Sequence, residues 1–212
     1  MSQHATLSPS GAHRWLHCPG SVALEAGYPD DSSEFADEGT AAHFLAEQCL
    51  LQRANASEFI DMEIALWADP ETETSGVNFA VSLLGKKGLT ISNSFTVGDD
   101  MAGHVQKYVD YVRAIGGELM VEQRLSIEHL TGEPGAKGTA DAVIVLGDEI
   151  IIVDLKYGRG VKVSAEKNEQ LAIYALAALR EFEFLGDFKR VRLVINQPRL
   201  DHVSEWDLQI GE

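Results

Sequence analysis

The chain has 212 residues, of which 45% are hydrophobic, and a formal net charge of −16. This length suits one domain, and apolar residues spread along the whole chain exclude a disordered protein. The negative charge excludes a protein that coats nucleic acid through its overall field, but not an enzyme that grips a phosphate backbone locally. No apolar run reaches about 18 residues, and the N-terminus lacks a signal-peptide pattern, so we expect a cytoplasmic protein that contacts no membrane.

The first half of the chain predicts mainly helices. A cap at Ser8 precedes a short helix that ends before Pro19. Apolar stripes indicate a second helix from about Asp37 to Arg53 and a third over "DDMAGHVQKYVDYVRAIGG", which stops at Gly116. Between them, residues 55–97 contain acidic and glycine-rich stretches, which predict exposed turns around a short strand or hairpin.

The second half of the chain predicts a sheet. Three strand-like runs, "ELMVEQRLSI", "GTADAVIVL" and "EIIIVDLKY", come first, and Gly147-Asp148 joins the last two by a tight turn. A helix from Ala165 to about Phe182 and two further strands, "FKRVRLVINQ" and "HVSEWDLQ", follow. We therefore expect one mixed α/β domain over residues 1–212. Its N-terminal portion, about 8–116, would be helical, and its core, about 117–209, would hold a mixed sheet of about five strands flanked by helices.

Opposite charges end the most hydrophobic strand. Asp154 and Lys156 lie two apart, so they share one face of the strand while Leu155 points into the opposite core. Pairing residues 143–146 with 149–152 across the tight turn would bring Asp141 close to Asp154. Two carboxylates and one lysine would then converge at one edge of the sheet.

Such a cluster suits a hard divalent cation. Mg²⁺ and Mn²⁺ prefer carboxylate, carbonyl and water oxygens, and two or three protein carboxylates are enough to hold Mg²⁺ with its waters. Lys156 beside the cation would orient a water or hold a phosphate oxygen. The alternative is a structural ion pair between Asp154 and Lys156 at a strand end.

Three motifs in this order resemble the PD-(D/E)XK nuclease superfamily, and more closely its RecB-like and phage-exonuclease branch. They are "GTAD" (Gly138–Asp141), "VDLK" (Val153–Lys156) and "QLAIY" (Gln170–Tyr174). The resemblance covers roughly residues 8–50 and 118–196. It implies a restriction-endonuclease-like core with Asp141, Asp154 and Lys156 as catalytic residues.

The resemblance extends to two residues upstream. In "GTAAH", His43 occupies the place of a metal ligand or a close neighbour of the metal, and its alternative is a partly buried helical histidine. Glu122 matches the glutamate that often precedes the "G-x-x-D" strand, and its alternative is an ordinary polar strand position. The resemblance thus implies one or two Mg²⁺ or Mn²⁺ ions held by Asp141, Asp154, the Leu155 carbonyl, Glu122 and His43.

The N-terminal "SPSGAHRWLHCPGS" also resembles this branch, whose iron–sulfur members use the cysteine of this motif together with a later cysteine triplet. Here Cys49 is the only other cysteine. We therefore expect no iron–sulfur cluster and a packing role for Cys18. His13, His17 and Cys18 form an alternative zinc set, but no fourth ligand at suitable spacing is evident.

The resemblance implies a metal-dependent DNA exonuclease that hydrolyses phosphodiester bonds from duplex ends in phage recombination or replication, encoded by a phage or prophage and acting in the bacterial cytoplasm. Gln170 and Tyr174 would position the DNA strand. Arg159, Lys162 and Lys167 are expected phosphate contacts, with ordinary surface charges as their alternative.

Endonuclease or single-strand activity, a non-catalytic DNA-end-binding or assembly module of the same fold, and an unrelated α/β binding domain are the alternative functions. Expected partners are DNA, a single-strand annealing or helicase protein, and further copies of the chain.

Overall fold

The computed structural model describes residues 5–25, 33–72 and 74–211. The first four residues, part of the stretch inspected for a signal peptide, lie outside these ranges. The helices are α1 (Ala12–His17), α2 (Ser21–Glu25), α3 (Glu34–Gln52), α4 (Asp99–Ile115), α5 (Glu128–Thr131) and α6 (Glu169–Glu181). The strands are β1 (Glu63–Asp69), β2 (Thr74–Phe79), β3 (Thr90–Thr96), β4 (Glu118–Ser126), β5 (Lys137–Leu146), β6 (Glu149–Leu155), β7 (Arg190–Gln197) and β8 (His202–Gln209).

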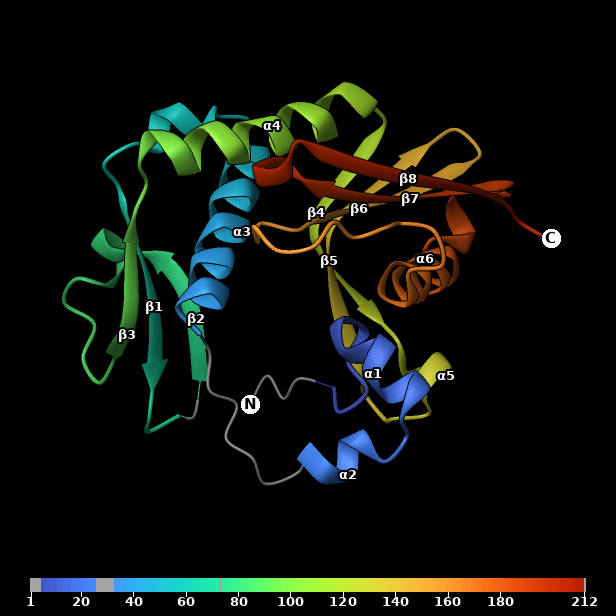
Figure 1. Cartoon of the computed structure of the whole chain (residues 1–212), viewed down its shortest axis with the longest axis horizontal. Helices are drawn as coiled ribbons and strands as arrows, with labels where there is room; N and C mark the ends of the chain where they lie inside the picture. Colours follow the sequence, from blue (N-terminus) through green and yellow to red (C-terminus); the bar gives the residue numbers. More distant parts are fainter. Residues whose placement is uncertain (1–4, 26–32, 73, 212) are drawn as a thin grey trace.

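A five-stranded mixed sheet in the order β4-β5-β6-β7-β8 forms the centre of the fold (Figure 1). Only β6 and β7 run parallel, and α6 connects them, as a parallel pair requires. The other neighbouring strands pair antiparallel. The mixed α/β class, the five-stranded sheet and its flanking helices are therefore confirmed.

The segment 55–97 differs from the sequence prediction of exposed turns around a short strand or hairpin. It forms a second, antiparallel sheet in the order β2-β1-β3, which lies beside α3 (Figure 1). Ile64 and Ala65 of β1 are buried. Polar side chains dominate β2 and β3 and mask the strand pattern, because these strands form the sheet's two edges. The N-terminal portion predicted as helical thus also holds three strands.

Two hydrophobic cores lie on opposite faces of the five-stranded sheet. Ile151, Val153 and Leu155 of β6 pack into the core with α3 and α4, whereas Ile150 and Ile152 pack into the core with α6. Every residue of β6 is buried, because helices cover both faces. This strand is the rigid support on which the charged residues at its end depend.

Capping side chains set the beginnings of α3 and α6, and the predicted beginnings of both helices were wrong. Helix α3 begins three residues earlier than predicted, because Ser33 Oγ accepts a hydrogen bond from Ala36 N–H. Helix α6 begins at Glu169 rather than Ala165, because the side chain of Asn168 caps it through Leu171 N–H at 3.1 Å. Helix α4 begins and ends as predicted.

Among the described residues, no helix combines the length and the apolar character that crossing a membrane requires.

Candidate functional site

The hairpin of β5 and β6 has the predicted register. Val143 pairs with Ile152 and Ala142 with Val153, so Asp141 and Asp154 follow at the open end of the hairpin. Asp141 Oδ2 accepts a hydrogen bond of 2.7 Å from Leu155 N–H. This bond ties the aspartate of one strand to the backbone of the other, beside Asp154.

A break in the pairing of β4 and β5 turns a second carboxylate toward this point. Residues on both sides of Glu122 and Asp141 pair in one register, but these two do not pair with each other. Glu122 has a left-handed φ of 49°, which a residue with a side chain adopts only when its surroundings enforce it. The alternation also changes here: Ala140 packs into the α6 core and Ala142 into the opposite core.

Helix α3 adds a histidine to these two carboxylates. His43 Nδ1 lies 3.2 Å from Asp141 Oδ1. One ligand atom from each of His43, Glu122 and Asp141 lies within 4.8 Å of the other two. We call this set of two carboxylates and their histidine partner the carboxylate trio. The two carboxylates come from the neighbouring strands β4 and β5, and the histidine comes from the distant helix α3.

Asp154 belongs to a second, adjoining set. Lys156 Nζ lies 2.9 Å from Asp154 Oδ2 and donates a hydrogen bond of 2.9 Å to Gln170 Oε1. Gln170 Nε2 in turn donates to Asp154 Oδ1, also at 2.9 Å. This closed triangle of Asp154, Lys156 and Gln170 explains how a nearly fully buried aspartate is tolerated at the strand end.

The electrostatics of the site show a shortage of positive charge. Burial raises the pKa of Glu122 to about 7, with a further contribution from Asp141. Burial also raises the pKa of Asp154, against the opposing effect of Lys156. Burial lowers the pKa of His43, but the negative charges of Asp141, Asp154 and Glu122 outweigh it and raise the pKa to about 9. Asp141 is the exception: despite its burial, the charge and hydrogen bond of His43 hold its pKa below the usual value.

These residues fit a divalent cation. Asp154 Oδ2 is buried and faces Lys156 Nζ at 2.9 Å, and no other described residue donates a hydrogen bond to it, so a lone pair remains for a cation. A cation would also relieve the mutual repulsion of Asp154, Asp141 and Glu122. Leu155 donates its N–H to Asp141, and the role of its carbonyl as a metal ligand stays a prediction.

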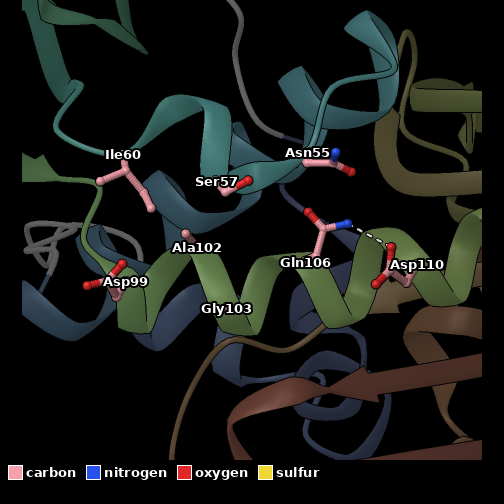
Figure 2. A pocket seen from close by; sticks show the side chains of 8 residues that line it. All are labelled: Asn55, Ser57, Ile60, Asp99, Ala102, Gly103, Gln106 and Asp110. Carbon is pink, nitrogen blue, oxygen red and sulfur yellow. Dashed lines mark hydrogen bonds between the residues drawn. The ribbon is translucent and has the colours of Figure 1, made fainter.

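A cavity of about 530 Å³ opens onto the carboxylate trio. Besides the trio, polar side chains from α3 and the N-terminal segment line it, namely Ser10, Thr40 and Glu47. A second hollow of about 480 Å³ lies between α4 and the residues 55–60. Figure 2 shows the side chains that line it. There Gln106 bonds to Asp110, and no member of the trio lines it. Only the first of these two hollows combines space with the clustered titratable groups.

The glycine of "GTAD" is required by packing. A Cβ at Gly138 would lie 2.6 Å from Pro9 Cγ and 2.9 Å from the Tyr174 ring. Tyr174 itself is only 5% exposed and packs in the α6 core. The motif residues Pro9, Gly138 and Tyr174 therefore hold the N-terminal segment, β5 and α6 together.

The three predicted phosphate contacts lie apart from this cluster. Arg159, Lys162 and Lys167 are exposed. Arg159 pairs with Asp100 of α4 at 3.1 Å. Among the described residues, none of the three cations contacts the trio or Asp154, which favours the surface role that was their alternative.

Comparison with known proteins identifies the family. A family model described as "Protein of unknown function (DUF2800)" matches residues 4–212. The chain belongs to the DUF2800 family. A solved structure titled "Crystal structure of SSO0001" is similar at 20% identity with a TM-score of 0.28, over 49% of this chain and 47% of that one. The chain thus aligns with about half of that structure.

Sequence reasoning missed two groups near the site of this DUF2800 member. Glu47 lies one helical turn after His43 and lines the same cavity. Its four-residue spacing from a suspected ligand was the signal that could have found it. Arg199 stacks 4.6 Å over the Tyr157 ring and pairs with Glu38 at 2.7 Å, which links the turn after β7 to α3. No local pattern indicates that contact.

Proposed function

We propose that the chain is a metal-dependent deoxyribonuclease with a PD-(D/E)XK-type site. The observation that carries the proposal is the convergence of His43, Glu122 and Asp141 beside the triangle of Asp154, Lys156 and Gln170. A structural ion pair would need only Asp154 and Lys156. It would not account for the strained backbone of Glu122 or for the convergence of Glu122 and Asp141 on His43.

The cation would be held by Asp141, Asp154 and Glu122, with His43 as a further ligand or neighbour. Carboxylate oxygens dominate this set, which favours Mg²⁺ or Mn²⁺ over softer metals. When bound, the ion would polarise a phosphate and stabilise the leaving oxygen.

The remaining chemistry falls to residues of the chain. The ammonium group of Lys156 carries three N–H donors. Its contacts with Asp154 and Gln170 fix its orientation. A free donor would hold a phosphate oxygen or the water that attacks phosphorus in line. Gln170 would act by positioning Lys156 and Asp154, since it bonds to both.

We further propose that the substrate is DNA with a free duplex end, that the chain works in the bacterial cytoplasm, and that an annealing or helicase protein or further copies of the chain assist it. These proposals rest on the resemblance of the motifs. The net charge of −16 repels a phosphate backbone, so we expect DNA binding to depend on the bound cation.

The test is degradation of labelled DNA by the purified chain with Mg²⁺ or Mn²⁺, using linear duplex, covalently closed circular and single-stranded substrates. An exonuclease degrades the linear duplex and leaves the circle intact. Cleavage of the circle indicates an endonuclease, and cleavage of the single strand alone indicates a single-strand-specific enzyme. If no DNA form is cleaved with either metal, the catalytic proposal is wrong. Binding of duplex ends without cleavage would then favour the non-catalytic module.

A further inference from the structure

A second cluster of metal-ligating side chains lies outside the carboxylate site. His13 and His17 occupy positions four apart on α1, so they share one face of the helix. Their rings lie 4.6 Å apart. Glu169, the first residue of α6, reaches both of them across the gap between the two helices.

The three side chains converge on one point. Glu169 Oε1 lies 3.3 Å from His13 Nδ1 and 3.0 Å from His17 Nε2. One ligand atom from each residue lies within 4.8 Å of the others. Zinc bonds of about 2.0–2.2 Å place the corners of a tetrahedron roughly 3.3–3.6 Å apart. The separations of Glu169 Oε1 from the two imidazole nitrogens are close to this range.

We propose that His13, His17 and Glu169 form a second divalent-metal site of zinc type, which cross-links α1 to the beginning of α6. Two imidazole nitrogens and one carboxylate oxygen favour zinc over Mg²⁺, whereas the carboxylate trio has the opposite preference. Cys18, the third ligand considered from the sequence, is exposed and is not part of this set. Glu169, about 150 residues further along the chain, is therefore the third ligand in place of Cys18.

The proposed cross-link lies next to the carboxylate site. Glu169 immediately precedes Gln170, which holds Asp154 and Lys156 in place. A metal on Glu169 would fix the first turn of α6 against the N-terminal segment. His13 and His17 have exposed side chains, 81% and 65%, so the ion could enter and leave from solvent.

Helix α1 is anchored without the metal. Ala12 of α1 is fully buried in the core with α6, and Trp15 packs against the same core. Replacing the exposed histidines should therefore leave the fold intact, and a loss of zinc binding can be assigned to the ligands themselves.

The experiment is equilibrium dialysis of the full chain against ZnCl₂ with MgCl₂ in excess. It is repeated in an Asp141→Asn background, which weakens the carboxylate site. One zinc ion per chain is expected in both proteins, and the unfolding temperature should rise with zinc. His17→Ala and Glu169→Gln should each weaken zinc binding by about tenfold or more and remove the rise. His129→Ala, which replaces an exposed histidine of α5 outside both clusters, is the matched control and should bind zinc as the wild type does.

Equal zinc affinity in the His17→Ala, Glu169→Gln and His129→Ala proteins would overturn the proposal, and so would the absence of zinc binding in the wild type. If Asp141→Asn fails to fold, the same three variants are compared in the wild-type background with Mg²⁺ in excess. Circular dichroism checks the fold of each. Because no DNA is used, the result is independent of the proposed nuclease activity.

Discussion

Glu122 is the residue whose backbone does most to shape the candidate site. Its φ of 49° interrupts the pairing of β4 with β5 opposite Asp141. A residue other than glycine pays about 1–3 kcal/mol for a sparsely populated backbone conformation, so the surrounding structure must enforce it. The result is that Glu122 and Asp141 both reach His43 of α3.

A carboxylate trio that binds a metal should gain stability from it. We expect Mn²⁺ to raise the unfolding temperature of the wild type, by an amount equivalent to about 2.7 kcal/mol at a hundredfold excess over its Kd. Asp141→Asn should largely remove this rise. Asp110→Asn, in the second hollow, should keep it. Differential scanning fluorimetry with and without Mn²⁺ measures the shift, and an unchanged shift in Asp141→Asn would contradict the assignment.

The two cysteines should differ sharply in reactivity. Burial raises the pKa of Cys49 to about 12, so near pH 8 almost none of its thiol is in the reactive thiolate form. Cys18 is exposed, contrary to its predicted packing role. We expect a disulfide reagent to modify one thiol per folded chain at pH 8 and two in denaturant. Cys18→Ser should leave none in the folded chain, and rapid modification of that variant would show that Cys49 is accessible.

At the residue scale, the sequence predicts what alternation and tight turns control. The approach of Asp141 to Asp154 followed from the Gly147-Asp148 turn and the hydrophobic register. The left-handed backbone of Glu122 could not be predicted, because glutamate has no local preference for it. The pairing of Glu169 with His13 was equally hidden, since it depends on how two distant helices pack.

At the element scale, β5 and α6 pack closely together because Gly138 of β5 has no side chain. Gly138 leaves room for Pro9 and Tyr174. This explains part of the "GTAD" motif by packing rather than by chemistry. The hydrophobic runs predicted β5, β6 and α6. The small sheet of residues 55–97 was predicted only in part, as a short strand or hairpin, because the polar strands β2 and β3 form its edges.

Adding a methyl group at Gly138 should therefore destabilise the protein. Gly138→Ala brings a Cβ to 2.6 Å from Pro9, and overpacking of this kind costs about 1–3 kcal/mol in the free energy of unfolding. Gly158→Ala is the control, since nothing lies within 4 Å of its Cβ position. Urea unfolding followed by circular dichroism compares the two. Equal stability of both variants would mean that the packing of the N-terminal segment is not as described.

At the scale of the whole molecule, β6 joins the two cores. Its side chains alternate between the core of α3 and α4 and the core of α6. Its end carries Asp154 of one candidate site, and α6, which begins with Glu169 of the other, packs against it. A substitution that weakens the packing of β6 should therefore lower the stability of the whole domain.

Truncation within β6 tests this. Ile151 is fully buried, and Ile151→Ala should lower the free energy of unfolding by about 2–5 kcal/mol through lost burial and a new cavity. Val161→Ala, at a residue 86% exposed, should change it by less than about 0.5 kcal/mol. Urea titration should give one cooperative transition in both. A separate early transition in Ile151→Ala would indicate that the two cores unfold independently.

Metal-dependent DNA cleavage at this site is tested most directly by comparing the cleavage rates of Lys156→Ala and Lys162→Ala, with Mn²⁺ binding measured on the same samples. Lys156 contacts Asp154 and Gln170, whereas Lys162 is an exposed lysine six residues later. We predict that Lys156→Ala lowers the cleavage rate by about a hundredfold or more while it still binds Mn²⁺, and that Lys162→Ala cleaves nearly as the wild type does. Wild-type cleavage rates in Lys156→Ala, or no cleavage by the wild type itself, would contradict the proposed nuclease function.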